Sequence, residues 1–515
     1  MKSGSPPGRR FATLSAALAT HAQDRPDSVA LSSAEECLSY EEVDALVAGL
    51  SGRLDRLGVG VGDRVAILGR NSPEWVLAFL ATLKIGGIAA PLNHRLGPRE
   101  LAAQLTAIEP ALVLHDEDLA SLVASAPHAA QGLTLHRESA DSRSIWRTRA
   151  NPVEHRDPTP ATAALISFTS GSTGVPKGAV ISHGALMSAS YAYADILNTT
   201  EGDRTLVMVP LFHNTGFCDQ VAHMLIVGGA SDLLVEYRTP AARTALLRRP
   251  ASYLIAVPGI LRLLANDQQA DAMFSRCDIA CYGGSPMPEA WINEFGARWP
   301  GLRLYNCYGL TEFTSLSHIL KPADLPSHSN TVGRPIRGVE QRLVDLAGDP
   351  VSIGAQGELL LAGPSRMSGY WGRPDLTREA LYGEWLRTGD MGVLTADGFL
   401  QLVGRVSEII NRGGEKVSPL QVEAALSMES EIADVAVIGA PHPIFGQRVI
   451  AFLTLRRTAE LDEEAVAHRL RERIADYAIP ERFLVVDELP RNAAGKTDRN
   501  ELRRIAEAQF EGVSG

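Results

Sequence analysis

Between residues 40 and about 320, the hydrophobic residues follow two alternating patterns. Stretches with the 3.6-residue period of an amphipathic helix, at 41–57 and 74–83, are followed by short apolar runs at 64–68 and 88–92. Strands that alternate with helices in this way predict parallel sheets covered by helices on both faces. We therefore expect an α/β fold in which this part of the chain forms two doubly wound α/β subdomains.

The pattern changes after residue 330. Up to residue 404, glycine and proline are dense and short strands such as 357–361 dominate. This pattern predicts a β-barrel-like subdomain. Together with the two α/β subdomains, it completes the large N-terminal domain that we expect over residues 1–404.

A small α+β domain is expected over residues 405–515. Its first helix begins near Ser418, which can cap the helix, and Pro419 fits the first helical position. Gln421 stands where a capping box requires Glu or Gln. The pattern then predicts two strands and a helix, over 434–439, 448–455 and 463–475. This length is sufficient for an independent domain.

The N-terminal sequence resembles an export signal. Arg9 and Arg10 precede a mostly apolar stretch at 11–19 that ends in a sequence loosely similar to a cleavage site. The competing interpretation is a first amphipathic helix that leads to a strand at 29–31. We favour the helix and expect a cytoplasmic protein. The longest apolar run, 75–81, falls far short of the ~20 residues of a membrane span.

Composition narrows the class of protein. A chain of 515 residues exceeds what one hydrophobic core supports, and 45% hydrophobic with 21% charged residues is typical of a soluble globular protein. The net charge of −11 argues against a nucleic acid as the main partner, because phosphate backbones require a basic surface. The odd number of cysteines and the lack of zinc-site spacing predict buried free thiols in a reducing compartment at Cys37, Cys218, Cys277, Cys281 and Cys307.

The segment richest in chemical information spans residues 167–179, SFTSGSTGVPKGA. It follows an apolar strand at 163–166. Glycines let such a loop turn several N–H groups and hydroxyls toward one anion, and the lysine makes phosphate the natural ligand. It is not a Walker loop, because Lys177 lies between Pro176 and Gly178 instead of preceding Ser or Thr. Alone, such a loop is also compatible with a flexible turn.

Further motifs follow in order along the chain. They are Tyr308-Gly309-Leu310-Thr311-Glu312, Arg387-Thr388-Gly389-Asp390, Gly404-Arg405 and Pro490-Arg491-Asn492-Ala493-Ala494-Gly495-Lys496. Together with the loop at 167–179, they resemble the motifs of the adenylate-forming superfamily, and most closely those of acyl-CoA synthetases. The resemblance implies an ATP-dependent, AMP-forming ligase. Such an enzyme joins a carboxylic acid to AMP with release of pyrophosphate and then transfers the acyl group to the thiol of coenzyme A. A mobile C-terminal lid is implied as well.

The resemblance assigns residues to ATP and to Mg²⁺. Residues of the phosphate loop would hold the β- and γ-phosphates: Thr169, Ser170, Gly171, Ser172, Thr173, Gly174 and Lys177. Glu312 would bind Mg²⁺, a hard cation that prefers oxygen ligands, and Thr311 would donate to the α-phosphate.

The adenosine would be held by Tyr308, which has a ring to stack on adenine, by the backbone of Gly283, Gly284 and Ser285, and by Asp390 and Arg405 at the ribose. Lys496 would be the mobile cation that bridges carboxylate and phosphate. Tyr308 as a core tyrosine, Asp390 as a turn residue and Lys496 as an inert loop lysine remain the alternatives.

The segment 210–217 resembles the part of the family that lines the acid pocket. Amino-acid-activating relatives carry an aspartate at the position that corresponds to Asn214. The neutral amide therefore favours a hydrophobic, non-amino carboxylic acid, while Asp219 keeps the amino-acid alternative open. His213 is expected to pack against the acid near the thiol channel. The predicted pocket comprises His213, Asn214, Phe217, Cys218 and Cys281.

One position departs from the family. Relatives usually carry Asp or Lys two residues after the position of Arg405, whereas this chain has Ser407. Serine can still act as the hinge, and transfer of the acyl-adenylate to another acceptor stays open as an alternative. The alternatives are a stand-alone adenylating enzyme that serves a phosphopantetheinyl carrier protein or a partner enzyme, a luciferase-like oxygenase, and a binding-only relative. The presence of Glu312 and Lys496 argues against the last.

Overall fold

The computed structural model describes residues 10–126, 130–137, 144–147, 158–169, 176–345, 347–406, 408–413, 415–457, 459–491 and 497–511. The chain divides into two compact units. Unit 1 comprises Met1–Gln341 and Leu361–Leu386, and unit 2 comprises Arg342–Leu360 and Arg387–Gly515.

The first sheet of unit 1 has nine strands in the order β15-β14-β13-β12-β11-β9-β10-β1-β2. Its strands are β1 (Val29–Ser32), β2 (Cys37–Ser39), β9 (Arg204–Val207), β10 (Ala230–Leu233), β11 (Tyr253–Ala256), β12 (Ile279–Gly283), β13 (Arg303–Leu310), β14 (Ser315–Leu320) and β15 (Arg334–Pro335). The inner strands from β1 to β13 pair in parallel, whereas β2, β14 and β15 pair antiparallel at the edges.

The second sheet of unit 1 has seven strands in the order β18-β8-β7-β4-β3-β5-β6. Its strands are β3 (Arg64–Leu68), β4 (Ile88–Leu92), β5 (Leu112–His115), β6 (Gln131–Thr134), β7 (Ala163–Thr169), β8 (Lys177–Ser182) and β18 (Gly369–Tyr370). Strands β7, β4, β3, β5 and β6 pair in parallel, and β8 and β18 extend the sheet antiparallel.

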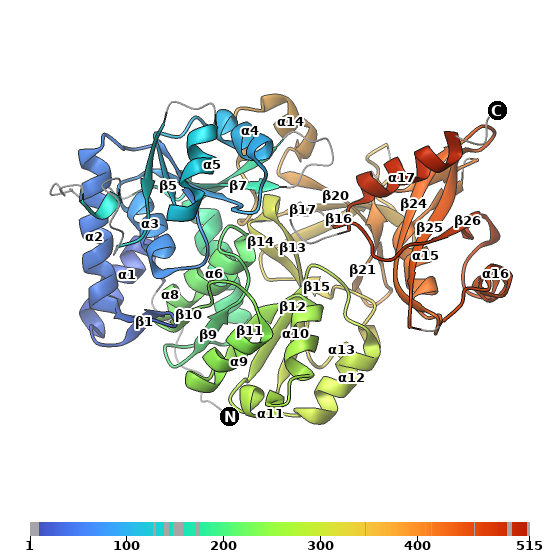
Figure 1. Cartoon of the computed structure of the whole chain (residues 1–515), viewed down its shortest axis with the longest axis horizontal. Coiled ribbons are helices and arrows are strands. Elements are labelled where there is room, and N and C mark those ends of the chain that lie inside the picture. The colour runs from blue at the N-terminus through green and yellow to red at the C-terminus, as the bar shows by residue number, and fades with distance from the viewer. Residues whose placement is uncertain are drawn as a thin grey trace. The chain divides into compact units, whose positions relative to one another are not determined.

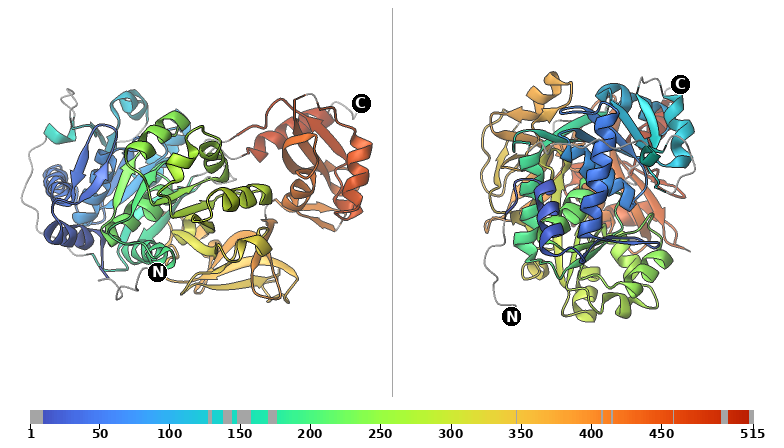
Figure 2. Two further views of the ribbon diagram at one scale, coloured as in Figure 1. Left: turned by 90° about the horizontal axis from the view of Figure 1, so that it is seen from below. Right: turned by 90° about the vertical axis from the view of Figure 1, so that its left-hand side faces the viewer.

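Helices connect and cover these strands, and Figures 1 and 2 both show α1 and α2 side by side. They are α1 (Leu14–Asp24), α2 (Tyr40–Arg56), α3 (Pro73–Lys84), α4 (Pro98–Ile108), α5 (Ala120–Ser125), α6 (His183–Leu197), α7 (Asn214–Gly216), the π-helix η3 (Phe217–Ala222), α8 (His223–Val227), α9 (Thr239–Arg248), α10 (Pro258–Ala265), α11 (Ala270–Phe274), α12 (Glu289–Arg298), α13 (Leu325–His328) and α14 (Pro374–Ala380). A short 3₁₀ turn, η4 (Thr311–Phe313), follows β13.

Local sequence signals explain several of these helices. The hydroxyl of Ser39 and the carboxylate of Glu42 form a reciprocal capping box at the start of α2. Helix α3 starts at a Ser72 cap followed by Pro73, and every residue from Pro73 to Leu83 is buried. A helix that is apolar and buried on all sides belongs inside the protein, so α3 forms part of the core of unit 1.

A third sheet contains the points at which the chain passes between the units. It has the order β16-β17-β20-β19, with β21 paired to β20. The strands are β16 (Glu340–Val344), β17 (Gln356–Ala362), β19 (Leu381–Tyr382), β20 (Trp385–Leu394) and β21 (Leu400–Arg405). The boundaries between units fall within β16, β17 and β20.

The C-terminal part of unit 2 is an α+β fold around the order β23-β22-β25-β24, with β26 parallel to β25. Its elements are β22 (Ile410–Arg412), β23 (Glu415–Val417), α15 (Pro419–Leu426), β24 (Ile432–His442), β25 (Gly446–Leu455), α16 (Glu463–Arg471), β26 (Arg482–Val485) and α17 (Arg499–Glu511). Alternate residues of β24 face opposite cores. Val437 packs with residues of α15 and α16, whereas Ile438 packs with Leu502 and Ala506 of α17.

The predicted fold class is confirmed, with a large α/β N-terminal part and a small α+β C-terminal domain. Several details differ from expectation. The strand expected over 163–166 extends to Thr169, so residues 167–169 of the expected phosphate loop belong to β7 and residues 177–179 to β8. The strands expected over 434–439 and 448–455 are longer, as β24 and β25. The helix predicted over 463–475 ends at Arg471, because Ala475 is extended ahead of the short turn Asp476–Ala478. Cys37 is exposed, because it lies in β2 at the edge of its sheet, whereas the other four cysteines are buried. Among the described helices, none is long and apolar enough to cross a membrane.

Candidate active site

The stem of the predicted phosphate loop is the antiparallel pair β7–β8. Thr169 ends β7 and pairs directly with Lys177 at the start of β8. The strands therefore bring Thr169 and Lys177, the first and the last of the predicted phosphate ligands, next to each other. The other predicted phosphate ligands lie outside the described residues: Ser170, Gly171, Ser172, Thr173 and Gly174.

Tyr370 connects the predicted metal ligand to the phosphate loop. Its hydroxyl donates to Glu312 Oε1 at 2.9 Å, and the Lys177 ammonium lies 5.9 Å from the centroid of its ring. Pairing of β18 with β8 places Tyr370 opposite Ala179, two residues from Lys177. The backbone of Glu312 is fixed as well, because its carbonyl accepts from Met367 N at 2.8 Å. A carboxylate is thus held within reach of the cation of the phosphate loop.

The turn that carries Thr311 and Glu312 depends on close contact between β13 and β14. The pairing register shifts between Tyr308 and Gly309, and a Cβ atom on Gly309 would overlap the Ser315 carbonyl oxygen. Tyr308 pairs with His318, and their rings lie 5.7 Å apart. A glycine is therefore required at 309 to let the strand reach η4.

Gly309→Ala is expected to lower adenylation by about 10²-fold, because the methyl group separates β13 from β14 and shifts Thr311 and Glu312 by about 1 Å. The measurement is acid-dependent exchange of pyrophosphate into ATP. Gly296→Ala on α12 is the matched control, since nothing lies within 4 Å of a Cβ atom there. Equal exchange rates for the two variants would contradict this role for Gly309.

The predicted adenine wall follows the end of β12. Gly283 pairs with Cys307 of β13, and a Cβ atom on Gly283 would overlap the Cys307 carbonyl oxygen. Gly284 has a φ of +78°, which other residues rarely adopt. Ser285 is exposed. Gly283 and Gly284 have no side chains. Their backbone groups, next to the strand that carries Tyr308, can therefore approach the edge of an adenine.

Asn214 of the predicted acid pocket links two strands of the site. Its Oδ1 atom accepts from Ser167 Oγ at 2.8 Å, and its Nδ2 atom donates to the Thr314 carbonyl at 3.0 Å. Thr314 has a φ of +63° and donates from Oγ1 to the Ser365 carbonyl at 2.6 Å. The amide thus holds the end of β7 against the start of β14.

The remaining predicted pocket residues differ in their surroundings. The ring of His213 contacts Phe212, at 4.4 Å between centroids. Phe217 packs 3.7 Å from Phe79 of α3, between ring centroids, and is part of the core. Cys218 and Cys281 are buried, and burial raises the pKa of both thiols. They are therefore neutral apolar groups at neutral pH.

In unit 2, the two predicted ribose ligands contact each other. Asp390 on β20 pairs with Arg405 on β21, and Arg405 Nε lies 2.9 Å from Asp390 Oδ1. The Asp390 side chain is 9% exposed and that of Arg405 is 55% exposed. The turn before Asp390 is supported by buried Glu358, which accepts from Arg387 Nε at 3.0 Å and from Gly389 N at 3.3 Å.

Lys496 and Ser407 lie outside the described residues. The ends of the lysine loop are close together, because Arg491 and Thr497 form an antiparallel bridge and Asp498 N donates to the Pro490 carbonyl at 2.7 Å. At the start of α17, Arg499 Nη1 donates to Glu423 at 2.8 Å, and Arg499 Nε lies 3.5 Å from Glu408. Arg499 therefore ties α17 to α15 and to the residue that follows Ser407.

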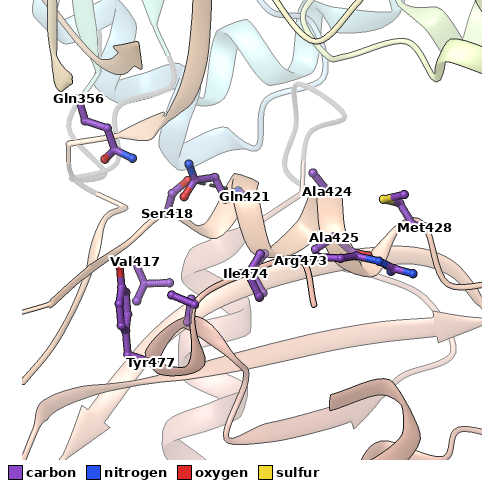
Figure 3. A pocket seen from close by; sticks show the side chains of 13 residues that line it. Gln356, Val417, Ser418, Gln421, Ala424, Ala425, Met428, Arg473, Ile474 and Tyr477 are labelled. Atoms are coloured by element: carbon purple, nitrogen blue, oxygen red, sulfur yellow. Dashed lines mark hydrogen bonds between the residues drawn. The ribbon is translucent and has the colours of Figure 1, made fainter. Parts of the chain in front are cut away.

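A cavity of about 540 Å³ lies in unit 2 beside α15 (Figure 3). The side chains around it include Gln421 and Met428 of α15 and its C-terminal turn, together with Arg473 and Tyr477 of the following segment. Arg473 is engaged with Glu429 at 2.6 Å. None of the predicted site residues lines this cavity.

The sequence did not reveal Tyr370 or Glu358. Tyr370 lies 58 residues from Glu312, and no spacing rule connects them. Glu358 offered one signal, a carboxylate inside the apolar strand 357–361, because buried carboxylates are paired.

Two family models match the chain. A model described as AMP-binding enzyme matches residues 18–371, and one described as AMP-binding enzyme C-terminal domain matches residues 421–496. The chain belongs to the AMP-binding enzyme family. This is the adenylate-forming superfamily that the motifs of the sequence resemble.

Curated relatives of this family cover nearly the whole chain. Indoleacetate–CoA ligase from Aromatoleum aromaticum is 32% identical over 493 residues, which are 94% of this chain and 96% of that protein. A fatty acid–[acyl-carrier-protein] ligase from Streptomyces coeruleorubidus is 31% identical and covers 94% of each chain.

The fold matches that of solved family members. O-succinylbenzoate CoA synthetase from Bacillus subtilis, in complex with its acyl-adenylate intermediate, superimposes with a TM-score of 0.86 at 28% identity over 95% of this chain and 97% of that chain. The same protein has been solved with ATP and a magnesium ion. The expected ATP-dependent, AMP-forming acid–CoA ligase that works through an acyl-adenylate is thereby confirmed, together with the cofactors ATP, Mg²⁺ and coenzyme A.

Proposed function

We propose that this ligase activates a hydrophobic, non-amino carboxylic acid, and specifically an aryl acid. The indoleacetate and o-succinylbenzoate ligases among the relatives act on acids with aromatic rings, which supports this choice. Neutral Asn214 supports it too, because its amide is engaged with Ser167 and Thr314 and offers no charge to an α-ammonium group.

The cluster of Lys177, Tyr370 and Glu312 is the observation that carries the proposal. Attack of a carboxylate on the α-phosphate passes through a highly anionic transition state, so positioning and positive charge supply the catalysis. Lys177, Thr169 and the hydroxyls and glycines of the loop 170–174 bind the β- and γ-phosphates. Glu312 would hold Mg²⁺ through hard carboxylate oxygens, and the Tyr370 hydroxyl orients that carboxylate.

The remaining predicted residues complete the binding of substrates. Thr311 donates to the α-phosphate, and Tyr308 stacks on an adenine that the backbone of residues 283–285 borders. Asp390 accepts from the ribose hydroxyls, and Arg405 orients Asp390. His213 packs against the acid, and Lys496 bridges the acid carboxylate and the phosphate.

The two half-reactions require a movable lid. We place the N-terminal domain at 1–404 and the lid at 405–515, with Ser407 as the hinge. The family models support this division, since their matches lie on either side of residue 405. Lys496 serves the first half-reaction and then leaves, so that a thiol can reach the adenylate.

Ser407→Pro is expected to preserve pyrophosphate exchange and to reduce thioester formation by orders of magnitude. Proline fixes φ near about −65° and removes an N–H group, which traps the lid in one orientation. Both half-reactions are measured on one preparation, with Ser407→Ala as the control that keeps the backbone free. Equal loss of the two half-reactions would indicate misfolding. If both half-reactions persist, the pivot lies elsewhere.

Coenzyme A is the acceptor in this proposal, and the thiol of a carrier protein is the second candidate. The Streptomyces relative favours the second, because its name specifies an acyl-carrier protein. Both acceptors present the same phosphopantetheine arm. We place the enzyme in the cytoplasm, where ATP and both acceptors are found.

The proposal is tested with a panel of aryl, fatty and amino acids, scored by pyrophosphate release with and without coenzyme A. Aryl acids are expected to give the highest rates, with acyl-CoA as the product. Activity with the amino acids and with none of the aryl or fatty acids would contradict the proposal. Adenylate that accumulates with coenzyme A but is consumed by a loaded carrier protein would select the second acceptor.

A further inference from the structure

Asp219 is a buried carboxylate for which the proposed chemistry has no use. It lies in η3, the π-helix that follows the predicted acid-pocket segment, and only 1% of the residue is exposed. Single π-turns of this kind occur often at functional sites. Ionisable side chains are rarely buried to this extent without a partner.

The two carboxylate oxygens have different surroundings. Oδ2 accepts from Ser315 Oγ at 2.6 Å and from Tyr193 OH at 3.2 Å. Oδ1 is buried and makes no hydrogen bond within the part of the chain that the structure describes, although the nearby Thr215 hydroxyl also lowers the pKa of the carboxylate. A buried polar oxygen without a partner destabilises the fold, so such an atom in a native protein calls for an explanation.

Asp232 provides the contrast within the same unit. It is also buried, and its Oδ2 atom likewise lacks a hydrogen bond among the described residues. However, Arg249 Nη1 lies 3.4 Å from its Oδ1 atom, so a cation compensates the carboxylate. No ion pair joins Asp219 to any of the described residues. Within the described structure, nothing therefore neutralises Asp219 if it ionises.

The location of Asp219 connects it to the acid pocket. Ser315, which binds its Oδ2, follows Thr314, and the Thr314 carbonyl holds Asn214. The Asp219 carboxylate also lies near enough to Cys281, another predicted pocket residue, to contribute to the raised pKa of that thiol. Asp219 thus lies among side chains of α6, η3, β12 and β14 that include Cys218 and Cys281 of the predicted pocket.

We propose that Asp219 is a specificity-determining residue whose Oδ1 atom accepts a hydrogen bond from a neutral donor, a hydroxyl or a ring N–H, on the acid substrate, at a position remote from the carboxylate. This inference rests on the proposed function, since it assigns a feature of the acid that the same site would bind. The carboxylate of the substrate remains at the phosphate side, and no proton is transferred at Asp219.

A site built to accept a hydrogen bond discriminates strongly against analogues that lack the donor, because the acceptor is then left unpaired. A hydrogen bond to a charged acceptor is expected to favour the donor-bearing acid by about 10- to 100-fold in kcat/KM. The discrimination is also expected to depend on pH. Burial raises the pKa of Asp219 to about 7, and the ionised carboxylate is the stronger acceptor.

The titratable groups around Asp219 are Tyr193 of α6, Tyr253 of β11, Cys218 and His223 next to it in the chain, Cys281 of β12 and Cys307 of β13. Burial raises the pKa of Tyr193, Tyr253, Cys218 and Cys281 and lowers that of His223 to about 4. These five groups are therefore neutral near pH 7. Selectivity for a donor-bearing acid is expected to increase from about pH 6 to about pH 8 as Asp219 ionises.

The test compares acids that differ only in the donor. The pairs are indole-3-acetate with 1-methylindole-3-acetate, 4-hydroxyphenylacetate with phenylacetate, and 4-hydroxycinnamate with cinnamate. For each pair, kcat/KM for pyrophosphate release is measured on the full-length protein at both ends of that pH range. The same ratios are measured for Asp219→Asn, which keeps the shape and cannot ionise, and for Asp219→Ala. Asp232→Asn is the matched control for a change at a buried aspartate.

The expected result is a preference for the donor-bearing acid of at least about tenfold in one or more pairs. This preference should fall and lose its pH dependence in Asp219→Asn, approach one in Asp219→Ala, and remain unchanged in Asp232→Asn. Ratios near one in the parent enzyme, or ratios that survive Asp219→Ala, would overturn the inference while leaving the proposed function intact. Failure of every acid in the panel to release pyrophosphate would instead overturn the proposed function and this inference with it.

Discussion

Lys496→Ala is expected to lower acid-dependent pyrophosphate exchange by about 10²–10³-fold, the usual effect of removing one preorganised donor from a developing negative charge. The same variant should still convert supplied acyl-adenylate to acyl-CoA at the parent rate, because the proposed mechanism uses the lysine only in the first half-reaction. The two half-reactions are measured separately, the second with chemically prepared acyl-adenylate.

Arg491→Ala is the control for this prediction. Arg491 precedes Lys496 in the same sequence motif, and it contacts Asp434 at 3.0 Å on the protein surface. Exposed ion pairs contribute little to stability, so both half-reactions are expected to persist in this variant. A Lys496→Ala enzyme that retains full exchange would remove the lysine from the first half-reaction. Loss of both half-reactions would indicate damage to the lid.

Glu312→Gln is expected to reduce adenylation by on the order of 10²-fold and to raise the Mg²⁺ concentration needed for half-maximal rate. Glutamine keeps the shape of the side chain and removes the negative charge that we propose holds the cation. The measurement is pyrophosphate exchange across a Mg²⁺ titration.

Tyr370→Phe tests the orientation of the Glu312 carboxylate without changing its charge. Phenylalanine keeps the ring near Lys177 and removes the hydroxyl that donates to Glu312 Oε1. Loss of an outer partner of a metal ligand typically costs about 10–100-fold in metal affinity, so the Mg²⁺ requirement should rise while the maximal rate changes less. Parent-like Mg²⁺ dependence in both variants would place the metal elsewhere.

The sequence was sufficient to predict several elements of the fold. The apolar runs 64–68 and 88–92 coincide with β3 and β4, because parallel strands that are buried on both faces appear in a sequence as nearly uninterrupted apolar runs. The Ser418 cap and Pro419 also form the start of α15 as predicted, with Ser418 Oγ accepting from Gln421 N.

Contacts made by strand pairing and burial could not be read from the sequence. Tyr370 reaches Glu312 only because β18 adds to β8, and no local pattern shows that pairing. Similarly, the sequence shows Asn214 as a neutral residue, but not that both ends of its amide are engaged. The burial of Asp219 and its unpaired Oδ1 atom depend on α6, η3 and β14, which lie far apart in the sequence.

The acyl-adenylate is the central claim, and the fate of the carboxylate oxygens tests it most directly. In the proposed reaction, a carboxylate oxygen attacks the α-phosphate, pyrophosphate leaves, and the thiol later breaks the bond between the acyl carbon and that oxygen. An aryl acid labelled with ¹⁸O at both carboxylate oxygens is therefore expected to yield AMP that carries one ¹⁸O atom, acyl-CoA that keeps the other ¹⁸O atom in its carbonyl group, and unlabelled pyrophosphate, as read by mass spectrometry. Appearance of the label in inorganic phosphate together with ADP would indicate an acyl phosphate and would contradict the account.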